Sequence, residues 1–511
     1  MSTVTGGPQI VRNGLILDLD ASSANSYGPI KAEVLVVAGG GAGGGYHGGG
    51  GGAGGVLYTL NCTIVRNTTY TVTVGLGGAG ANANSNTGDP GQNSIFSGAS
   101  TVLTAVGGGA GKSQGNATAA RNNGGSGGGG CDGNGSSITG GSGTTGQGFT
   151  GGDVSGEAGN LLVVYYGTAG GGGAGGVGGT GGIVNGGFGG PGLPFSISGT
   201  TQYYGGGGGG TNLTTVLTYG IGGIGGGGTG GVSPTPYNSP LRYSTNGSAN
   251  TGGGGGGYLY SGLGGGSGGS GIVIIRYKGP QKATGGTITT VGTETVHTFT
   301  SSGTFVTGTN FIDLSGNNNN GTINGAIFNS ANGGSIVFDG LDDYISITNN
   351  STLRPTSELT IEYIIKGTTP SGWCPIIGYG NGDYTNGNYL CWVETGGALQ
   401  SLCRINNGGV IEYRQYSGIG ISTTTLKYMS FTMRIGDSIK SYYNGVNTNT
   451  PTNLPAGGSF YYGGTSSPYQ IVGLGGAWLN GSILFFRLYN RALTAAEVSQ
   501  NYEATKTRFG L

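Results

Sequence analysis

The chain has 511 residues, of which 127 are glycine, and its 20 Lys and Arg balance 20 Asp and Glu. That is about 25% glycine, against about 7% in ordinary proteins. Zero net charge argues against nucleic-acid partners and acidic membranes, the 8% charged fraction argues against the usual disordered chain, and no apolar run is long enough for membrane insertion.

The glycine is concentrated in the middle of the chain. Residues 39–305 hold 93 of the 127 glycines, about 35% of that segment. The first residues show no basic region or cleavage site, so no secretory signal is expected. The sequence predicts short strands at the apolar runs Val34–Ala38, Tyr70–Val74, Leu161–Tyr166 and Gly271–Tyr277. These runs disfavour the alternative of a flexible linker, which is usually rich in Ser and charge.

Between these runs, unbroken glycine stretches such as Gly48–Gly52, Gly205–Gly210 and Gly252–Gly257 suit extended helices of the polyproline II type. Without Cβ atoms such helices can pack side by side and bond through backbone N–H and C=O groups. Ordering glycine costs roughly 0.5–1 kcal/mol per residue relative to alanine. Backbone bonding, helped by close assembly between copies, is expected to offset that cost.

From Phe311 onward the pattern is that of an all-β domain with one helix. Turn signals recur every few residues, as in a two-sheet sandwich, and Asn444-Gly445 is a strong hairpin turn. Thr494 and Glu497 form a capping box that predicts a C-terminal helix. The predicted strands are Ser335–Phe338, Tyr344–Ile347, Leu359–Ile365 and Ser482–Tyr489, and the segment Ser441–Val446 contains the hairpin turn.

Several C-terminal segments closely resemble the laminin-G-like, concanavalin-A-like lectin/glucanase jelly roll. They are GTNFIDLSGNNNNGTINGA, GGSIVFDGLDDYISI, YYNGV and ILFFRLYNRALTAAEVSQNY. Asn13–Tyr27 resembles the first strand of the same family, so the glycine-rich block is expected to be an insertion into a jelly-roll loop. The predicted division is 1–28 for the first strand, 29–307 for the inserted domain and 308–511 for the remaining jelly roll.

The middle resembles a second family, the glycine-rich domain of phage tail and virion proteins. The resemblance rests on EVLVVAGGGAGGG, YTVTVGLGGAG and GGSGIVIIRY. VHTFTSSGTF, which commonly precedes such a block, here follows it, and whether it packs beside residues 30–38 or belongs to the junction stays open. The expected fold class is thus mainly β: a jelly roll with an inserted domain of short strands and polyglycine II-like helices, and one C-terminal helix.

The sequence gives no support for catalysis. Glucanases of the resembled fold place paired carboxylates in an E-x-D-x-x-E pattern, whereas Glu362 is followed by Ile364 at the second position. His47 and His297 are far apart, and the five cysteines show no zinc spacing. The many GxGxxG matches are expected by chance at this glycine content. The protein is expected not to be an enzyme.

Oxygen donors cluster on two loops and make Ca²⁺ the candidate cofactor. Asp313, Asn317 and Asn319 lie on one loop, and Asp339 and Asp342, with Asp343, lie on the other. Ca²⁺ takes six to eight oxygen ligands of these kinds, and members of the resembled fold often bind it near such loops. The alternative is that these side chains only stabilise turns.

Aromatic residues among turn residues suggest a glycan-binding site at Trp373, Tyr379 and Tyr384. An aromatic ring can stack on a sugar, with polar groups beside it; the alternative is packing within the sandwich.

The resemblances imply a phage structural protein on the virion exterior, made in the host cytoplasm. The expected role is that of a tail-fibre or adhesin component, forming a homotrimer and binding other virion proteins and host surface polysaccharide or protein. The alternative is a head fibre, capsid decoration or baseplate protein in which the jelly roll only docks.

Overall fold

The computed structural model forms two compact units. The sandwich unit comprises Met1–Pro29 and Gly308–Leu511, and the glycine-rich unit comprises Ile30–Thr307. The predicted strand Leu161–Tyr166 lies outside the described residues. Those residues are 8–23, 26–80, 87–114, 119–131, 139–155, 167–182, 185–212, 218–231, 243–259, 264–379, 388–462, 468–472 and 478–511.

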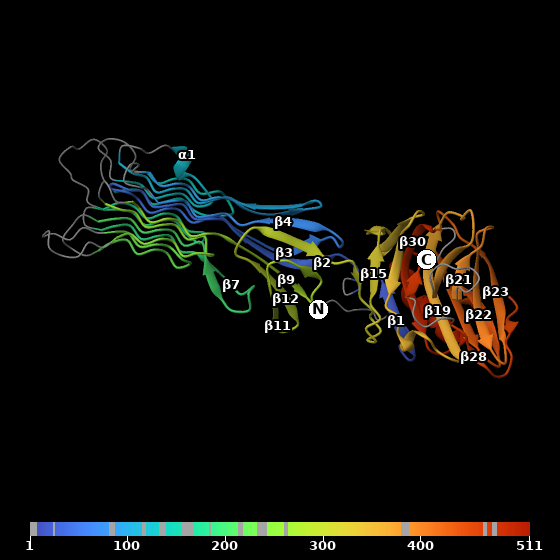
Figure 1. Cartoon of the computed structure of the whole chain (residues 1–511). Helices are drawn as coiled ribbons and strands as arrows, with labels where there is room; N and C mark the ends of the chain where they lie inside the picture. Colours follow the sequence, from blue (N-terminus) through green and yellow to red (C-terminus); the bar gives the residue numbers. More distant parts are fainter. Residues whose placement is uncertain are drawn as a thin grey trace, which may run out of the picture. The chain divides into compact units, whose positions relative to one another are not determined.

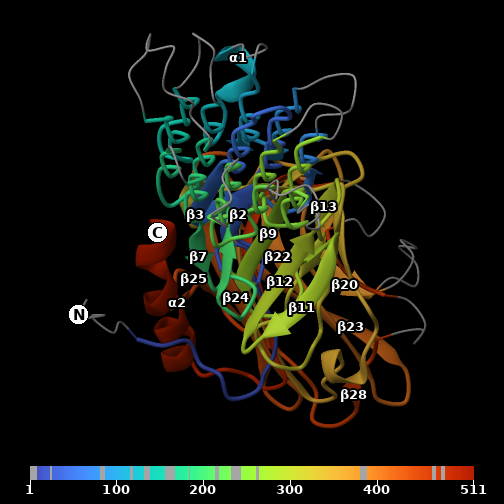
Figure 2. The same ribbon diagram turned by 90° about the vertical axis from the view of Figure 1, so that its left-hand side faces the viewer.

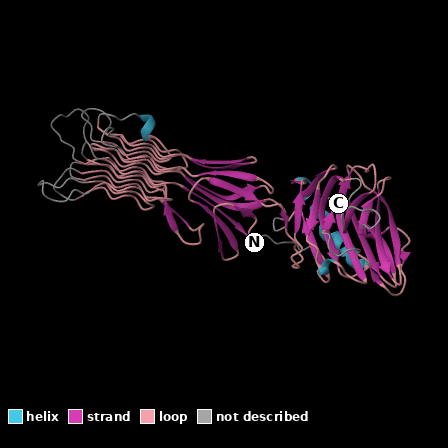
Figure 3. Cartoon of the chain, in the orientation of Figure 1, coloured by secondary structure: helices cyan, strands magenta, loops and turns pink. Residues whose placement is uncertain are grey.

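The sandwich unit consists of two antiparallel sheets (Figures 1 and 3). The first runs in the order β16 (Ile327–Asn329), β17 (Ser335–Asp339), β30 (Asn480–Tyr489), β19 (Glu358–Gly367), β24 (Lys427–Arg434), β25 (Ser438–Tyr443) and β26 (Val446–Asn447), with β1 (Leu15–Asp20) on β30 and β27 (Thr452–Asn453) on β25. The second runs in the order β14 (Asn310–Phe311), β15 (Gly321–Asn324), β18 (Tyr344–Ile347), β29 (Tyr469–Ile471), β20 (Cys374–Tyr379), β21 (Asn388–Val393), β22 (Ala398–Asn406) and β23 (Val410–Gly420), with β28 (Ser459–Phe460) on β22.

The core of this unit lies between the two sheets, because alternate residues of each strand face inward. Ile361 and Phe431 from the first sheet and Ile377 and Val393 from the second belong to one buried cluster. The predicted hairpin turn is confirmed: Asn444 and Gly445 have φ of 49° and 77°, as a type I′ turn requires.

The C-terminal helix is also confirmed. Helix α2 (Ala495–Phe509) begins at the Thr494–Glu497 capping box and ends at Gly510 in the left-handed conformation. Phe509 packs with Tyr428 and Phe485 on the face of the first sheet that points away from the core. The helix therefore covers that face. Two 3₁₀ turns complete the unit, η1 (Ala331–Gly333) and η2 (Ser351–Leu353).

The base of the glycine-rich unit is two five-stranded sheets with an apolar core between them. One runs β11 (Thr287–Val291), β12 (Glu294–Phe299), β9 (Ile272–Lys278), β2 (Ile30–Val37) and β3 (Val56–Ile64); the other runs β10 (Ala283–Thr284), β13 (Gly303–Thr307), β4 (Thr69–Thr73), β5 (Ser94–Gly98) and β6 (Thr101–Ala105). A hairpin of β7 (Leu193–Phe195) and β8 (Gln202–Tyr204) and the short helix α1 (Ala119–Asn122) accompany them. The VHTFTSSGTF element thus forms β12 and β13, and β12 pairs with β9 rather than with β2.

The glycine stretches extend from this base as extended segments lying side by side (Figure 1), and Figure 2 shows the same segments nearly end-on, as coils. Residues 49–55 show their geometry. The N–H groups of Gly49, Gly52 and Gly55 donate to the segment 106–112. The N–H groups of the residues that lie between them donate to two other segments, 169–172 and 252–255, alternately. Bonding that repeats every third residue in three directions is that of polyglycine II. We call this array the glycine lattice.

Most lattice glycines are fixed by close backbone approach. A Cβ at Gly50 would lie 2.0 Å from the Gly208 carbonyl oxygen, and one at Gly254 would lie 2.0 Å from the Gly51 carbonyl oxygen. Alanine does occur inside the array, as at the fully buried Ala53. Across the part of the chain that the structure describes, no helix is long and apolar enough to cross a membrane.

Candidate functional site

The outer face of the second sheet of the sandwich unit carries an aromatic and charged cluster. Register places Trp392 of β21 opposite Gln400 of β22, and Gln400 opposite Tyr416 of β23. These side chains share the outer face because Cys391, Val393 and Leu399, one position away along their strands, face the core. Helix α2 lies on the other sheet, so it does not cover this face.

Two tryptophans form the centre of the cluster. The indole of Trp373, just before β20, lies parallel to that of Trp392, with ring centroids 5.6 Å apart and an interplanar angle of 4°. Trp392 is 2% exposed, whereas Trp373 is 37% exposed. The buried indole therefore supports a second indole that solvent can reach.

Charged groups adjoin the stacked rings. The Arg414 guanidinium carbon lies 5.1 Å from the Trp373 ring centroid and 5.6 Å from that of Trp392. The Glu412 carboxylate accepts from Arg414 at 2.6 Å and lies 3.3 Å from an Arg404 nitrogen. Arg414 is thus positioned against the aromatic faces by Glu412, a favourable cation–π arrangement.

Two polar atoms beneath the cluster have no hydrogen-bond partner among the described residues: Trp392 Nε1 and Gln400 Oε1. The other end of the Gln400 amide donates to Glu394 Oε2 at 2.5 Å. A donor and an acceptor left unpaired in neighbouring buried residues destabilise the site. The groups that a ligand can reach are the Trp373 indole and the partly exposed Arg414 guanidinium beside it, an aromatic surface next to hydrogen-bond donors.

Of the three predicted glycan-binding residues, the structure places Trp373 in this cluster. Tyr379 is the last residue of β20, and its side chain is outside what is described; Tyr384 lies outside the described residues. Sequence reasoning missed Arg414 and Gln400. The signal was the outward alternation of Glu412, Arg414 and Tyr416 in β23, but only the register brings it beside Trp392.

The loop with Asp313, Asn317 and Asn319 binds the N-terminal strand. The Asp313 carboxylate accepts from the backbone N–H groups of Asp18, Ser315 and Asn319 and from the Ser315 hydroxyl. Asn317 Nδ2 and Asn319 Nδ2 donate to the carbonyls of Leu15 and Ile16 at 3.2 and 2.8 Å. These hydrogen bonds attach β1 across the insertion. A Ca²⁺ site on this loop stays a prediction.

The other predicted loop does bring carboxylates together. Oxygens of Asp339, Asp342 and Asp343 lie within 4.8 Å of one another, and the first two residues are exposed. Burial and repulsion from Asp339 and Asp342 raise the pKa of Asp343, although a hydrogen bond from the Asp339 backbone opposes the rise. The charge and spacing of this group fit a hard cation.

Other side chains that could take part in chemistry, namely Glu362, His297 and the cysteines, lie in the interior. Glu362 is fully buried, accepts from Asn501 Nδ2 at 2.9 Å, and its pKa is raised by burial to about 7. The ring of His297 bonds the Tyr277 hydroxyl and the Gly285 carbonyl, and burial lowers its pKa. All five cysteines are buried, and each is a thiol rather than part of a disulfide.

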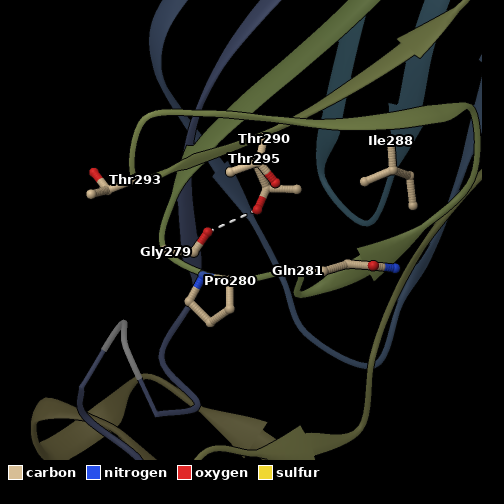
Figure 4. A pocket seen from close by; sticks show the side chains of 7 residues that line it. All are labelled: Gly279, Pro280, Gln281, Ile288, Thr290, Thr293 and Thr295. Atoms are coloured by element: carbon tan, nitrogen blue, oxygen red, sulfur yellow. Dashed lines mark hydrogen bonds between the residues drawn. The ribbon is translucent and has the colours of Figure 1, made fainter.

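A cavity of about 480 Å³ lies in the glycine-rich unit, beside the β11–β12 hairpin (Figure 4). Gln281, Ile288 and three threonines contribute to its lining, and Thr295 Oγ1 donates to the Gly279 carbonyl at 2.8 Å. Its lining contains no charged side chain, so it offers less chemistry than the tryptophan cluster.

Family comparison identifies two domains. Residues 22–278 match a glycine-rich domain, and residues 338–499 match the concanavalin A-like lectin/glucanases superfamily. None of the curated proteins compared with the chain matches it.

Solved structures resemble part of the chain at low similarity. The binding domain of Paraclostridial Mosquitocidal Protein 1 is 18% identical over 37% of this chain and 48% of that one, with a TM-score of 0.29. Domain 4 of AbnA, an arabinanase from Geobacillus stearothermophilus, in complex with arabinotriose, is 18% identical over 37% and 91% of the two chains, with a TM-score of 0.28. Trypanosoma rangeli sialidase is 14% identical over 40% and 32%, with a TM-score of 0.29. The chain thus spans about half of the mosquitocidal domain structure and a third of the sialidase.

The glycine-rich match covers half of the chain, and the second match agrees with the two-sheet sandwich. The chain therefore belongs to the glycine-rich domain family and carries a sandwich unit of the concanavalin A-like lectin/glucanase fold.

Proposed function

We propose that the sandwich unit is a non-enzymatic carbohydrate-binding module and that the Trp373 face is its binding site. The observation that carries this proposal is the solvent-accessible Trp373 indole, stacked on Trp392 with the Arg414 guanidinium beside it. The C–H face of a sugar ring packs against an indole, and its hydroxyl groups accept hydrogen bonds from a neighbouring guanidinium. Glu362, the carboxyl whose pKa burial raises to about 7, is not part of this face, because it lies buried beneath α2.

The proposed setting is the exterior of a bacteriophage particle, in a tail-fibre or adhesin component that recognises host surface glycans. The resemblance of the middle segment to phage glycine-rich domains supports it. A head fibre, capsid decoration or baseplate protein is the alternative. Immunogold labelling of particles with an antibody against the chain distinguishes tail from head, and absence from particles contradicts the setting.

The binding proposal predicts that Trp373→Ala weakens glycan binding at least tenfold, about 1.4 kcal/mol, without lowering the melting temperature. The partly exposed indole contributes more to the ligand than to the core. The measurement is a glycan array with the full chain, followed by calorimetric titration of the best ligand. Tyr203→Ala, which removes a similarly exposed aromatic ring from the glycine-rich unit, is the control. Silence across the array, or equal affinity of Trp373→Ala and wild type, contradicts the proposal.

Calcium at Asp339, Asp342 and Asp343 stays a prediction. We expect EDTA to lower the melting temperature of the sandwich unit by a few degrees, because a bound cation relieves the repulsion among three carboxylates. Tryptophan emission follows that unit, since Trp373, Trp392 and Trp478 all lie in it. Asp342→Asn should abolish the shift. An identical melting curve with and without EDTA contradicts calcium binding here.

A further inference from the structure

One edge of the glycine lattice carries a continuous row of exposed apolar side chains. Phe149, Val177, Phe188, Ile221 and Ile224 are each 46% to 60% exposed. We call these five residues the apolar row.

The lattice hydrogen bonds show that the row is continuous in space. Gly178 N–H donates to the Thr150 carbonyl, Gly179 N–H to that of Phe188, and Gly189 N–H to that of Ile221, at 2.7 to 3.0 Å. The four segments that carry the row are therefore successive neighbours along one edge.

The three-residue period explains why these side chains point outward. Gly187 and Gly189 donate to two neighbouring segments, whereas Phe188 between them faces solvent. A Cβ at such an outward position keeps another backbone from extending the lattice, since close pairing tolerates only glycine. Any contact across this edge is consequently made by side chains.

Termination of the lattice does not by itself require apolar residues. Another part of its perimeter, residues 244–248, exposes Thr245, Asn246 and Ser248 instead. Five large apolar side chains about half exposed amount to on the order of 500 Å², a size at which apolar patches mark interaction sites. Among the described residues of the four segments, Asp153 at one end is the only charged one.

We propose that the apolar row is a self-association surface, against which a second copy of this chain packs with its own row. An edge with so little charge suits an apolar partner. A second copy of the chain presents such a partner, because it carries the same apolar row with the same spacing of side chains. Two rows together would bury on the order of 1,000 Å², the lower bound for a specific interface. This inference is independent of the glycan-binding proposal.

The test is sedimentation equilibrium of the full chain between about 1 and 100 µM. Wild type is expected to contain assemblies of at least two copies. Phe188→Asp should weaken association at least thirtyfold, because a buried charge would face an apolar row. Val102→Asp, at a similarly exposed apolar position in β6, is the matched control and should associate as wild type does.

Circular dichroism melting checks that both variants fold. If Phe188→Asp unfolds, Val177→Ser tests the same surface with a smaller change. A wild-type monomer at 100 µM, or equal association of the row variants and wild type, overturns the proposal.

Discussion

Gly50→Ala is expected to unfold the glycine-rich unit or destabilise it by more than about 4 kcal/mol, at the extreme of single substitutions. The new Cβ would lie 2.0 Å from the Gly208 carbonyl oxygen. That oxygen belongs to a backbone held on several sides, so it cannot move aside as a flexible side chain could. The lattice must separate at this point and lose the hydrogen bonds that compensate for ordering glycine.

Hydrogen exchange of residues 39–55 measures this effect, and tryptophan emission, which reports on the sandwich unit, should change little. Gly182→Ala is the matched control, because the nearest atom to its Cβ is Ser155 Oγ at 3.7 Å. If Gly50→Ala retained slow exchange in these residues, the backbone around Gly50 would have room for a Cβ, and the prediction would be wrong.

Arg487→Met is expected to destabilise the sandwich unit by about 3–5 kcal/mol at pH 8, the usual effect of breaking a buried ion pair. Arg487 Nε bonds Asp18 Oδ1 at 3.0 Å, and both side chains are almost fully buried. Burial raises the pKa of Asp18 and of Glu362, and the guanidinium opposes both shifts. Without Arg487 the two carboxyls lose that compensation, and their pKa values rise further.

The sign of the pH dependence follows from these shifts. A carboxyl whose pKa is higher in the folded state binds protons more tightly there, so stability falls as pH rises above the unfolded value. The loss caused by Arg487→Met should therefore be smaller at pH 5 than at pH 8. Urea unfolding followed by tryptophan emission measures it. Arg434→Met, which breaks the more exposed pair with Glu358, should cost less than about 1 kcal/mol; equal effects of the two substitutions would contradict the argument.

Local patterns were sufficient for many elements. The alternation in Leu359–Ile365 predicts β19, Asn444-Gly445 predicts its hairpin turn, and Thr494 with Glu497 predicts the start of α2, because each depends on residues close in sequence. The glycine runs predict polyglycine II because a residue without Cβ permits the close approach. These features determine the mainly β fold class.

The sequence by itself thus determined several of the strands, the glycine helices and the start of the last helix. The tertiary structure decided which of these segments lie side by side. Glycine runs are chemically alike, so only the folded lattice shows that Phe188 and Val177 lie on one edge. Likewise, register alone brings Trp392, Gln400 and Arg414 together. The attachment of β1 by Asp313 could not be read locally either, since that hydrogen bond joins residues 295 positions apart. Contacts between distant segments depend on packing, and no local pattern encodes their partners.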